Sequence, residues 1–162
     1  MKHNIRVLGI DPGLARLGWA IIENRSGTAA LVGCGCVETT AGQLLEHRLQ
    51  TLHERVTDII REYRPDRMAV EKLFFTKNVT TGIAVAHARG VLILAAAEHG
   101  LPVDEYTPTS VKSSVTGDGR ADKRQMGRMI QLLLNLTRLP KHDDTVDAIA
   151  IALCGSASKV LH

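Results

Sequence analysis

Few cysteines and no long apolar run occur in this sequence, and each shortage excludes a class of protein. The three cysteines, Cys34, Cys36 and Cys154, are an odd number in 162 residues, so a disulfide framework is not expected. No apolar run reaches the roughly 20 residues of a membrane-spanning helix, and residues 1–6 lack the basic and then apolar order of a signal peptide. We therefore expect a compact cytoplasmic protein with free thiols and no membrane partner.

Two of the cysteines lie in one expected strand. Cys34 and Cys36 are two positions apart, which places both side chains on the same face. A zinc site needs further Cys or His ligands close by, and neither residue type occurs beside this pair in the sequence. We interpret both as buried strand thiols rather than as metal ligands.

The excess of positive charge is also small, at +3, so the total does not by itself indicate a polyanionic partner. Its distribution is more informative, because residues 107–141 contain seven basic and two acidic side chains. These are Lys112, Arg120, Lys123, Arg124, Arg128, Arg138 and Lys141 against Asp118 and Asp122. Such a segment suits a phosphodiester substrate, although a solvated helix face explains it equally well.

Length and apolar content fit one domain with one substantial core. Strands are expected at residues 6–10, 17–23, 29–38, 68–70 and 103–106, the first three as an antiparallel meander. Helices are expected at residues 44–63, 79–99, 109–115, 123–134 and 144–154. The helix at 79–99 is rich in Ala and Gly and apolar on most sides, which favours packing against a sheet or a second subunit.

Acidic residues stand in apolar surroundings at separate places in the chain. Asp11 and Glu71 each end an apolar strand, and Asp147 lies inside an apolar helix, three residues after Asp144. A lone buried carboxylate costs several kcal/mol or changes its pKa until it is neutral. Because acids three apart share a helix face and repel each other, a bound cation compensates them more economically than separate buried salt bridges. Asp143, at the helix start, is better explained as a helix cap.

The ligand types indicate which cation. Carboxylate oxygens without a Cys/His cluster favour Mg²⁺ or Mn²⁺ over zinc. Two such ions about 4 Å apart can generate a hydroxide and stabilise the leaving oxygen in a phosphoryl displacement. The four acids, Asp11, Glu71, Asp144 and Asp147, are therefore interpreted as catalytic ligands of two metal ions in a nuclease.

Three motifs carry a resemblance to a known family. They are Gly9-Ile10-Asp11-Pro12-Gly13, Val70-Glu71-Lys72-Leu73-Phe74-Phe75 and Asp144-Thr145-Val146-Asp147-Ala148-Ile149-Ala150-Ile151-Ala152. In this order they resemble the RuvC family of Holliday-junction resolvases over essentially the whole chain. The resemblance implies an α/β, ribonuclease-H-like fold with a five-stranded mixed sheet flanked by helices, one nuclease domain over residues 1–162, and the four acids as catalytic tetrad.

The resemblance also implies what the protein binds. It suggests a homodimer that holds a four-way DNA junction and nicks two strands symmetrically in recombination and repair, with the branch-migration proteins RuvA and RuvB as partners. Phe74 looks suited to stack on an unpaired base at the crossover, which contributes about 1–3 kcal/mol per base, whereas core packing explains Phe75 equally well. The residues expected to contact DNA are Phe74, Phe75, Lys77, Lys112, Arg120, Lys123 and Arg124.

One position departs from part of the family. Some relatives use His three residues before the last acid, where this chain has Asp144. We assign the fourth place of the tetrad to Asp144 and keep His142 as an outside candidate for a metal ligand or general acid.

Three other functions compete with the resolvase. An RNA-processing nuclease of the same fold shares the first Asp and some later acids. An ATPase of the actin and sugar-kinase type also begins with a strand, an Asp and a Gly-rich turn, but needs two duplicated domains, for which this chain is too short. A non-catalytic junction-binding module leaves the four acids without a purpose.

Overall fold

The computed structural model describes residues 4–72 and 79–158, and its elements follow the order expected from the sequence. The elements are β1 (Ile5–Asp11), β2 (Arg16–Arg25), β3 (Thr28–Glu38), α1 (Leu45–Tyr63), β4 (Arg67–Glu71), α2 (Val79–Glu98), β5 (Val103–Tyr106), α3 (Pro108–Thr116), α4 (Lys123–Leu134) and α5 (Asp143–Ala157). The ends of β5 and α4 coincide with the expected ones, and the other ends differ by at most three residues. Within the described ranges, no helix is long and apolar enough to cross a membrane.

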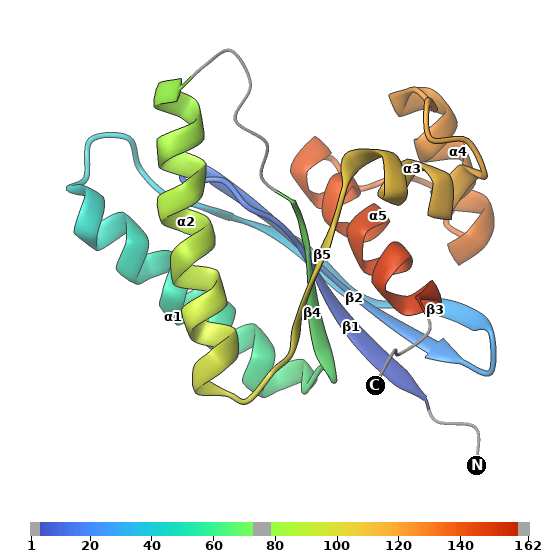
Figure 1. Cartoon of the computed structure of the whole chain (residues 1–162), viewed down its shortest axis with the longest axis horizontal. Coiled ribbons are helices and arrows are strands. Elements are labelled where there is room, and N and C mark those ends of the chain that lie inside the picture. Colours follow the sequence, from blue (N-terminus) through green and yellow to red (C-terminus); the bar gives the residue numbers. More distant parts are fainter. Residues whose placement is uncertain (1–3, 73–78, 159–162) are drawn as a thin grey trace.

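The five strands form one mixed sheet in the order β3-β2-β1-β4-β5. The first three strands pair antiparallel, as expected for a meander, whereas β4 pairs parallel to β1 and β5 parallel to β4. Helices α1 and α2 lie on one face, and α3, α4 and α5 lie on the other (Figure 1). The prediction of a five-stranded mixed sheet flanked by helices is confirmed.

The central strands are buried on both faces, which explains why they read as continuous apolar runs. Leu8 and Ile10 of β1 face the core under α1 and α2, whereas Val7 faces the core under α5. Neighbouring strand residues point to opposite faces, so one strand supplies both cores. β1 is thereby held firmly on both sides, with Asp11 at its end.

Helix α5 lies against the sheet because two glycines let the backbones touch. A Cβ atom on Gly9 would lie 2.3 Å from the Ala148 carbonyl oxygen, and one on Gly18 would lie 1.8 Å from the Asp144 carbonyl oxygen. No side chain fits in either gap. This close approach brings the first turns of α5, with Asp144 and Asp147, to the end of β1.

Gly18→Ala is therefore expected to destabilise the protein by about 3 kcal/mol or more, because the new methyl group must push the α5 backbone away from β2. Chemical unfolding curves would measure the loss. Gly42→Ala is the matched control, since nothing lies within 4 Å of a Cβ there. Equal stability of the two variants would contradict the packing described for α5.

Candidate active site

Side chains from two strands, β1 and β4, and three helices, α3, α4 and α5, meet in a pocket of about 350 Å³ at the end of β1 and β4. Three of the predicted acids, Asp11, Glu71 and Asp147, line it. Lys112 of α3 and Lys123 of α4 line it as well, and the rest of its wall includes apolar residues of α3, α4 and α5. Acidic and basic groups therefore share one concave site.

The strand register places the first two acids side by side. Ile10 pairs with Val70 in the parallel β1–β4 ladder, so Asp11 and Glu71, the next residue of each strand, lie at adjacent carboxyl ends. Asp147 comes from the first turns of α5, which rest on β1 at Gly9. The structure thus brings these three acids, distant in the sequence, into one pocket.

Asp11 shows the strongest electrostatic consequence of this arrangement. Burial and, after it, the Asp147, Asp144 and Glu71 carboxylates together raise its pKa from 3.8 to about 7, although Lys123 acts in the opposite direction. A pKa near 7 means that the ionised form of this carboxyl group is unfavourable compared with a carboxyl group in water. A cation bound beside Asp11 would stabilise the ionised form.

The other two pocket acids follow the same pattern. Burial, then the Asp147 carboxylate, raises the pKa of Glu71, and Lys112 lowers it. Burial also raises the pKa of Asp147, where Lys123 lowers it and Asp143 and Asp144 raise it. The two lysines therefore compensate only part of the negative charge.

Asp144 differs from the other three acids. It does not line the pocket, and its Oδ2 lies 3.3 Å from Nε of Arg16 at the start of β2. It is still close enough to raise the pKa of Asp11. Sequence reasoning missed Arg16, although the turn between β1 and β2 places it near the end of β1.

The capping role expected for Asp143 is wrong. His142 occupies the N-cap position of α5 and its side chain makes no capping hydrogen bond. Asp143 is the first helical residue, and Lys123 Nζ donates to its Oδ2 at 3.2 Å. The pairing of these two exposed groups raises the pKa of Lys123.

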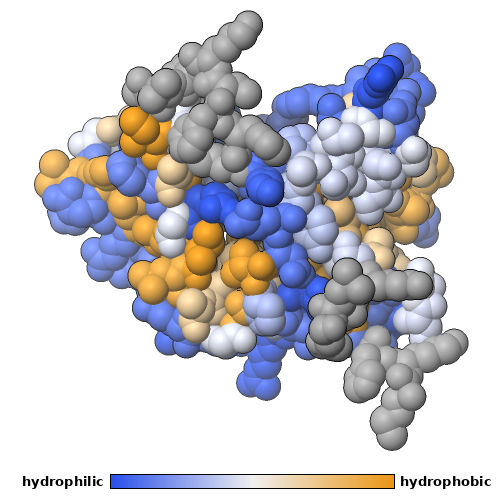
Figure 2. Space-filling view, in the orientation of Figure 1, coloured by the Kyte–Doolittle hydropathy of each residue, from blue (hydrophilic) through white to orange (hydrophobic). Residues whose placement is uncertain are grey.

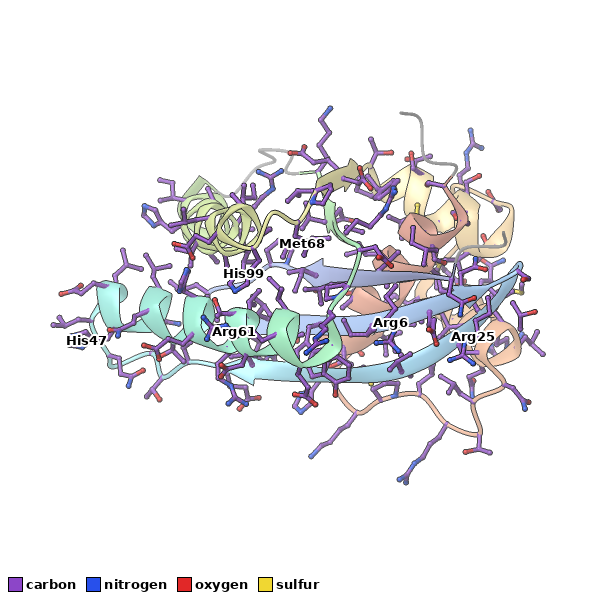
Figure 3. All side chains as sticks on the ribbon, turned by 90° about the horizontal axis from the view of Figure 1, so that it is seen from below. Arg6, Arg25, His47, Arg61, Met68 and His99 are labelled. Atoms are coloured by element: carbon purple, nitrogen blue, oxygen red, sulfur yellow. The ribbon has the colours of Figure 1, made fainter. Side chains whose placement is uncertain are left out.

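Basic groups at the opposite end of the sheet are engaged elsewhere. Arg6 and Arg25 both pair with Glu23, at 3.4 and 2.7 Å (Figure 3), and hydrogen bonding to Arg25 is the main reason that the pKa of Glu23 is lowered. Arg67, at the start of β4, pairs with Asp104 at 2.9 Å. These arginines therefore do not add to the partial compensation that Lys112 and Lys123 give the acids of the pocket.

The donor set fits hard divalent cations, since Asp11, Glu71, Asp144 and Asp147 offer only carboxylate oxygens. No three of these described acids bring one oxygen each within 4.8 Å of one another. Carboxylates that repel each other are expected to stay apart until a cation draws them together. The residue types thus suit Mg²⁺ or Mn²⁺, and their oxygens lie farther apart than the ligands of a bound ion would.

The residues expected to contact DNA divide into three groups. Lys112 and Lys123 line the pocket, whereas Arg120 and Arg124 are exposed and do not line it. Phe74, Phe75 and Lys77 lie outside the described residues.

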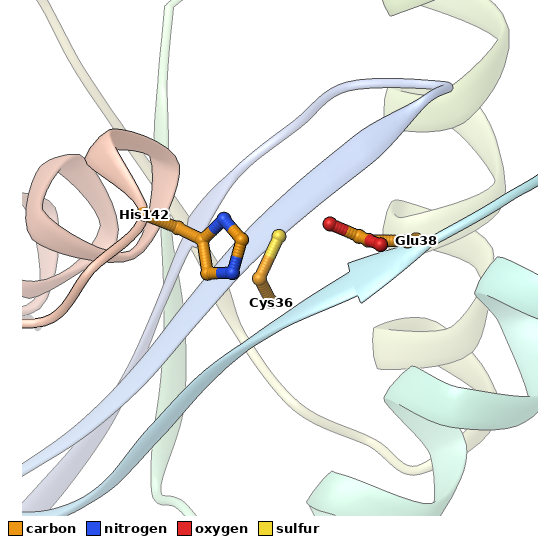
Figure 4. A group of neighbouring side chains, drawn as sticks. All are labelled: Cys36, Glu38 and His142. Carbon is orange, nitrogen blue, oxygen red and sulfur yellow. The ribbon is translucent and has the colours of Figure 1, made fainter.

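Two expectations about Cys36 and His142 need correction. Cys34 and Cys36 are free but half-buried rather than buried, because β3 is an edge strand of the sheet. His142 does not line the pocket with the acids. Its ring lies instead beside Cys36 and Glu38 (Figure 4). A histidine is therefore close to Cys36 in the folded protein, although none is close to it in the sequence.

Similarity to known proteins agrees with this architecture. A model of the family described as crossover junction endodeoxyribonuclease RuvC matches residues 7–155. Proteins of that name from Chloroflexus aggregans and Alkaliphilus oremlandii are 49% identical over 150 residues and 47% identical over 148. The first alignment covers 93% of this chain and 92% of the relative, and the second covers 91% of this chain and 90% of the relative.

Solved structures share the fold. Thermus thermophilus RuvC in complex with Holliday junction substrate aligns with a TM-score of 0.89 and 33% identity, over 93% of this chain and 92% of that one. The yeast mitochondrial Holliday junction resolvase is only 15% identical and aligns with a TM-score of 0.65, over 94% of this chain and 79% of its own, which supports the fold alone. The fold is ribonuclease-H-like, as the sequence resemblance implied. Given this fold and the family match from residue 7 to residue 155, the chain belongs to the RuvC family of crossover junction endodeoxyribonucleases.

Proposed function

We propose that this protein is a structure-selective endonuclease that resolves four-way DNA junctions by paired, symmetric nicks in recombination and repair. The observation that carries the proposal is the pocket in which Asp11, Glu71 and Asp147 meet beside Lys112 and Lys123. The relatives' names and the junction-bound Thermus thermophilus structure supply the substrate class. A junction suits this pocket because its phosphates are anionic and its cleavage is a phosphoryl displacement.

The four acids, Asp11, Glu71, Asp144 and Asp147, would hold two Mg²⁺ or Mn²⁺ ions. When bound, such ions supply activation of a water molecule and stabilisation of the leaving 3′ oxygen. Asp11, at the end of the central strand β1 between β2 and β4, would be the ligand shared between the two ions. Asp144 would exchange its Arg16 partner for a cation, because that ion pair is exposed on the Arg16 side and is worth little in water.

The basic side chains would position the scissile strand. Lys112 and Lys123 face the same pocket as the acids, so they can neutralise phosphates on either side of the bond that is cut. Arg120 and Arg124 would contact the DNA further out. Phe74, Phe75 and Lys77 stay predicted contacts at the crossover.

Cleavage of a synthetic four-way junction with an immobile core tests the proposal. Each strand is labelled in turn and incubated with Mg²⁺ or Mn²⁺, beside a linear duplex of the same sequence. We expect paired nicks at symmetric positions in two strands of like polarity, and little cutting of the duplex. Absence of paired nicks with either ion would count decisively against a resolvase, and preferential cutting of a structured RNA would favour the RNA-processing alternative.

A homodimer would supply the two active sites that paired nicks require. Ile83 and Leu94 of α2 are 49% and 54% exposed, and hydrophobic side chains reach the surface over the part of the molecule that carries α1 and α2 (Figure 2). The exposed side of α2, which carries Ile83 and Leu94, is our proposed interface, and sedimentation equilibrium should give the mass of two chains. RuvA and RuvB are the proposed branch-migration partners.

Lys112→Ala is expected to weaken junction binding and to make its salt dependence less steep by about one unit of the log–log slope, because one phosphate contact is lost. Titrations at several salt concentrations would measure both effects. Arg61→Ala is the control, since Arg61 is exposed on α1, on the opposite face of the sheet (Figure 3). An unchanged slope for Lys112→Ala would mean that Lys112 does not contact the DNA backbone.

A further inference from the structure

A second group of metal-type side chains lies apart from the pocket of acids. Cys36, Glu38 and His142 each offer one ligand atom, and these three atoms all lie within 4.8 Å of one another (Figure 4). Cys36 and Glu38 are alternate residues of β3 and share one face of the strand. His142 directly precedes α5, so the packing of α5 on the sheet brings together residues more than 100 positions apart.

The three side chains make few other polar contacts. Among the described residues, no ion pair or hydrogen bond engages the Glu38 carboxylate or the His142 ring. The Cys36 thiol has a weak contact of 4.0 Å to the Val37 carbonyl oxygen and a hydrogen bond from the backbone of Leu17. Cys36 and His142 are half-buried and Glu38 is exposed. None of the three lines the pocket that contains Asp11, Glu71 and Asp147. The group is therefore accessible and lies outside the pocket of acids, on the side of Asp144.

The ligand types indicate a different ion from that of the acidic pocket. A thiolate and an imidazole suit Zn²⁺ and similar borderline-soft ions, whereas Mg²⁺ prefers oxygen ligands alone. Ligand atoms at the usual zinc distances of about 2.0–2.3 Å lie about 3.5 Å from one another in a tetrahedron. Small rotations of Glu38 and His142 would close the gap, and a water molecule would complete the coordination.

We propose that Cys36, Glu38 and His142 form a second metal site, for Zn²⁺ or a similar divalent transition ion, which ties the segment before α5 to the edge strand β3. The site stabilises the position of the first two turns of α5, which carry Asp144 and Asp147. It does not depend on the proposed nuclease activity, since its ligands are outside that pocket.

Binding must release the thiol proton. Burial raises the pKa of Cys36, and the Asp144 and Glu38 carboxylates raise it further, so the thiol is protonated before the ion binds. The ion takes the place of that proton on sulfur, and one proton leaves to the buffer. The same carboxylates that hold the proton on sulfur also attract a divalent cation.

Co²⁺ is the probe that separates this site from the acidic pocket, because a thiolate ligand gives a sulfur-to-cobalt charge-transfer band and carboxylates give none. The full-length protein is titrated with Co²⁺ under reducing conditions. We expect one thiolate-bound Co²⁺ per chain, displaced by Zn²⁺, and a Zn²⁺-dependent rise in the thermal unfolding midpoint. Asp11→Asn should retain the band, because Asp11 belongs to the other site.

Matched variants identify the ligands. Cys36→Ser should abolish the band, and His142→Gln should weaken Co²⁺ binding by more than about 100-fold, since even partners of metal ligands change affinity about 10- to 100-fold. Cys34→Ser is the control, because Cys34 is half-buried on the same face of β3 and should leave the band unchanged. Circular dichroism checks that each variant folds. If Cys36→Ser does not fold, the Glu38→Gln and His142→Gln variants test the site instead, because each should weaken Co²⁺ binding. Absence of the band in the unaltered protein, or its survival in Cys36→Ser, would overturn the proposal.

Discussion

Replacing Asp11 by asparagine is expected to lower junction cleavage by more than about 100-fold while leaving junction binding intact. Changes to mere hydrogen-bonding partners of metal ligands typically alter activity about 10- to 100-fold, and Asp11→Asn removes the charge of a ligand itself. The amide has nearly the same volume as the carboxyl group, so the contacts of β1 with its neighbours remain. Single-turnover cleavage and gel-shift binding of the same junction would measure the two properties.

The control for this variant is Asp58→Asn, the same chemical change at an exposed position of α1. It should cleave at the normal rate. If Asp11→Asn loses junction binding and the folded state together, Asp11 has a structural role instead. If it cleaves normally, the acids of the pocket are not the catalytic ligands.

The second large effect concerns stability and pH. In the folded protein the pKa of Asp11 is raised from 3.8 to about 7, so the folded state holds a proton that the unfolded chain has already lost between these values. The stability contributed by Asp11 is full below about pH 4 and is lost as the pH rises through 7. Without divalent ions, the free energy of unfolding should therefore fall across this window by several kcal/mol through this group.

Urea unfolding at pH 5 and pH 8 in EDTA would measure this slope, and Asp11→Asn should flatten it and be the more stable protein at pH 8. Mg²⁺ should restore stability to the unaltered protein, mainly at pH 8, because it binds the ionised acids of the folded state alone. Equal slopes for the two proteins would show that Asp11 is not buried among like charges. A Mg²⁺ effect of the same size in Asp11→Asn would place the ion elsewhere.

The elements of the fold follow closely from the sequence because its local signals agree with one another. Asp11-Pro12-Gly13 ends one strand, and the apolar period of residues 45–60 indicates a helix with one polar face. These signals act over a few neighbouring residues. The meander of β1, β2 and β3 was expected from their short spacing. The parallel placement of β4 and β5 depends instead on pairing between distant segments, which local signals do not specify.

The acids of the site could be foreseen for a related reason. A carboxylate in an apolar segment is costly wherever the segment goes, so Asp11, Glu71 and Asp147 stood out before their positions in space were known. Arg16 and His142 carry no such signal, because an exposed arginine and a histidine beside a helix start are common. Their roles beside Asp144 and Cys36 arise only when α5 packs on the sheet.

Contact between α5 and the two strand glycines has a consequence for protein synthesis. The ribosome makes β1 and β4 early, and α5 comes last among the described elements. A nascent chain that has already exposed Asp11 and Glu71 still lacks Asp147, so it cannot assemble the pocket. The half-made polypeptide, and any product of premature termination before α5, is therefore expected to be unable to cut DNA.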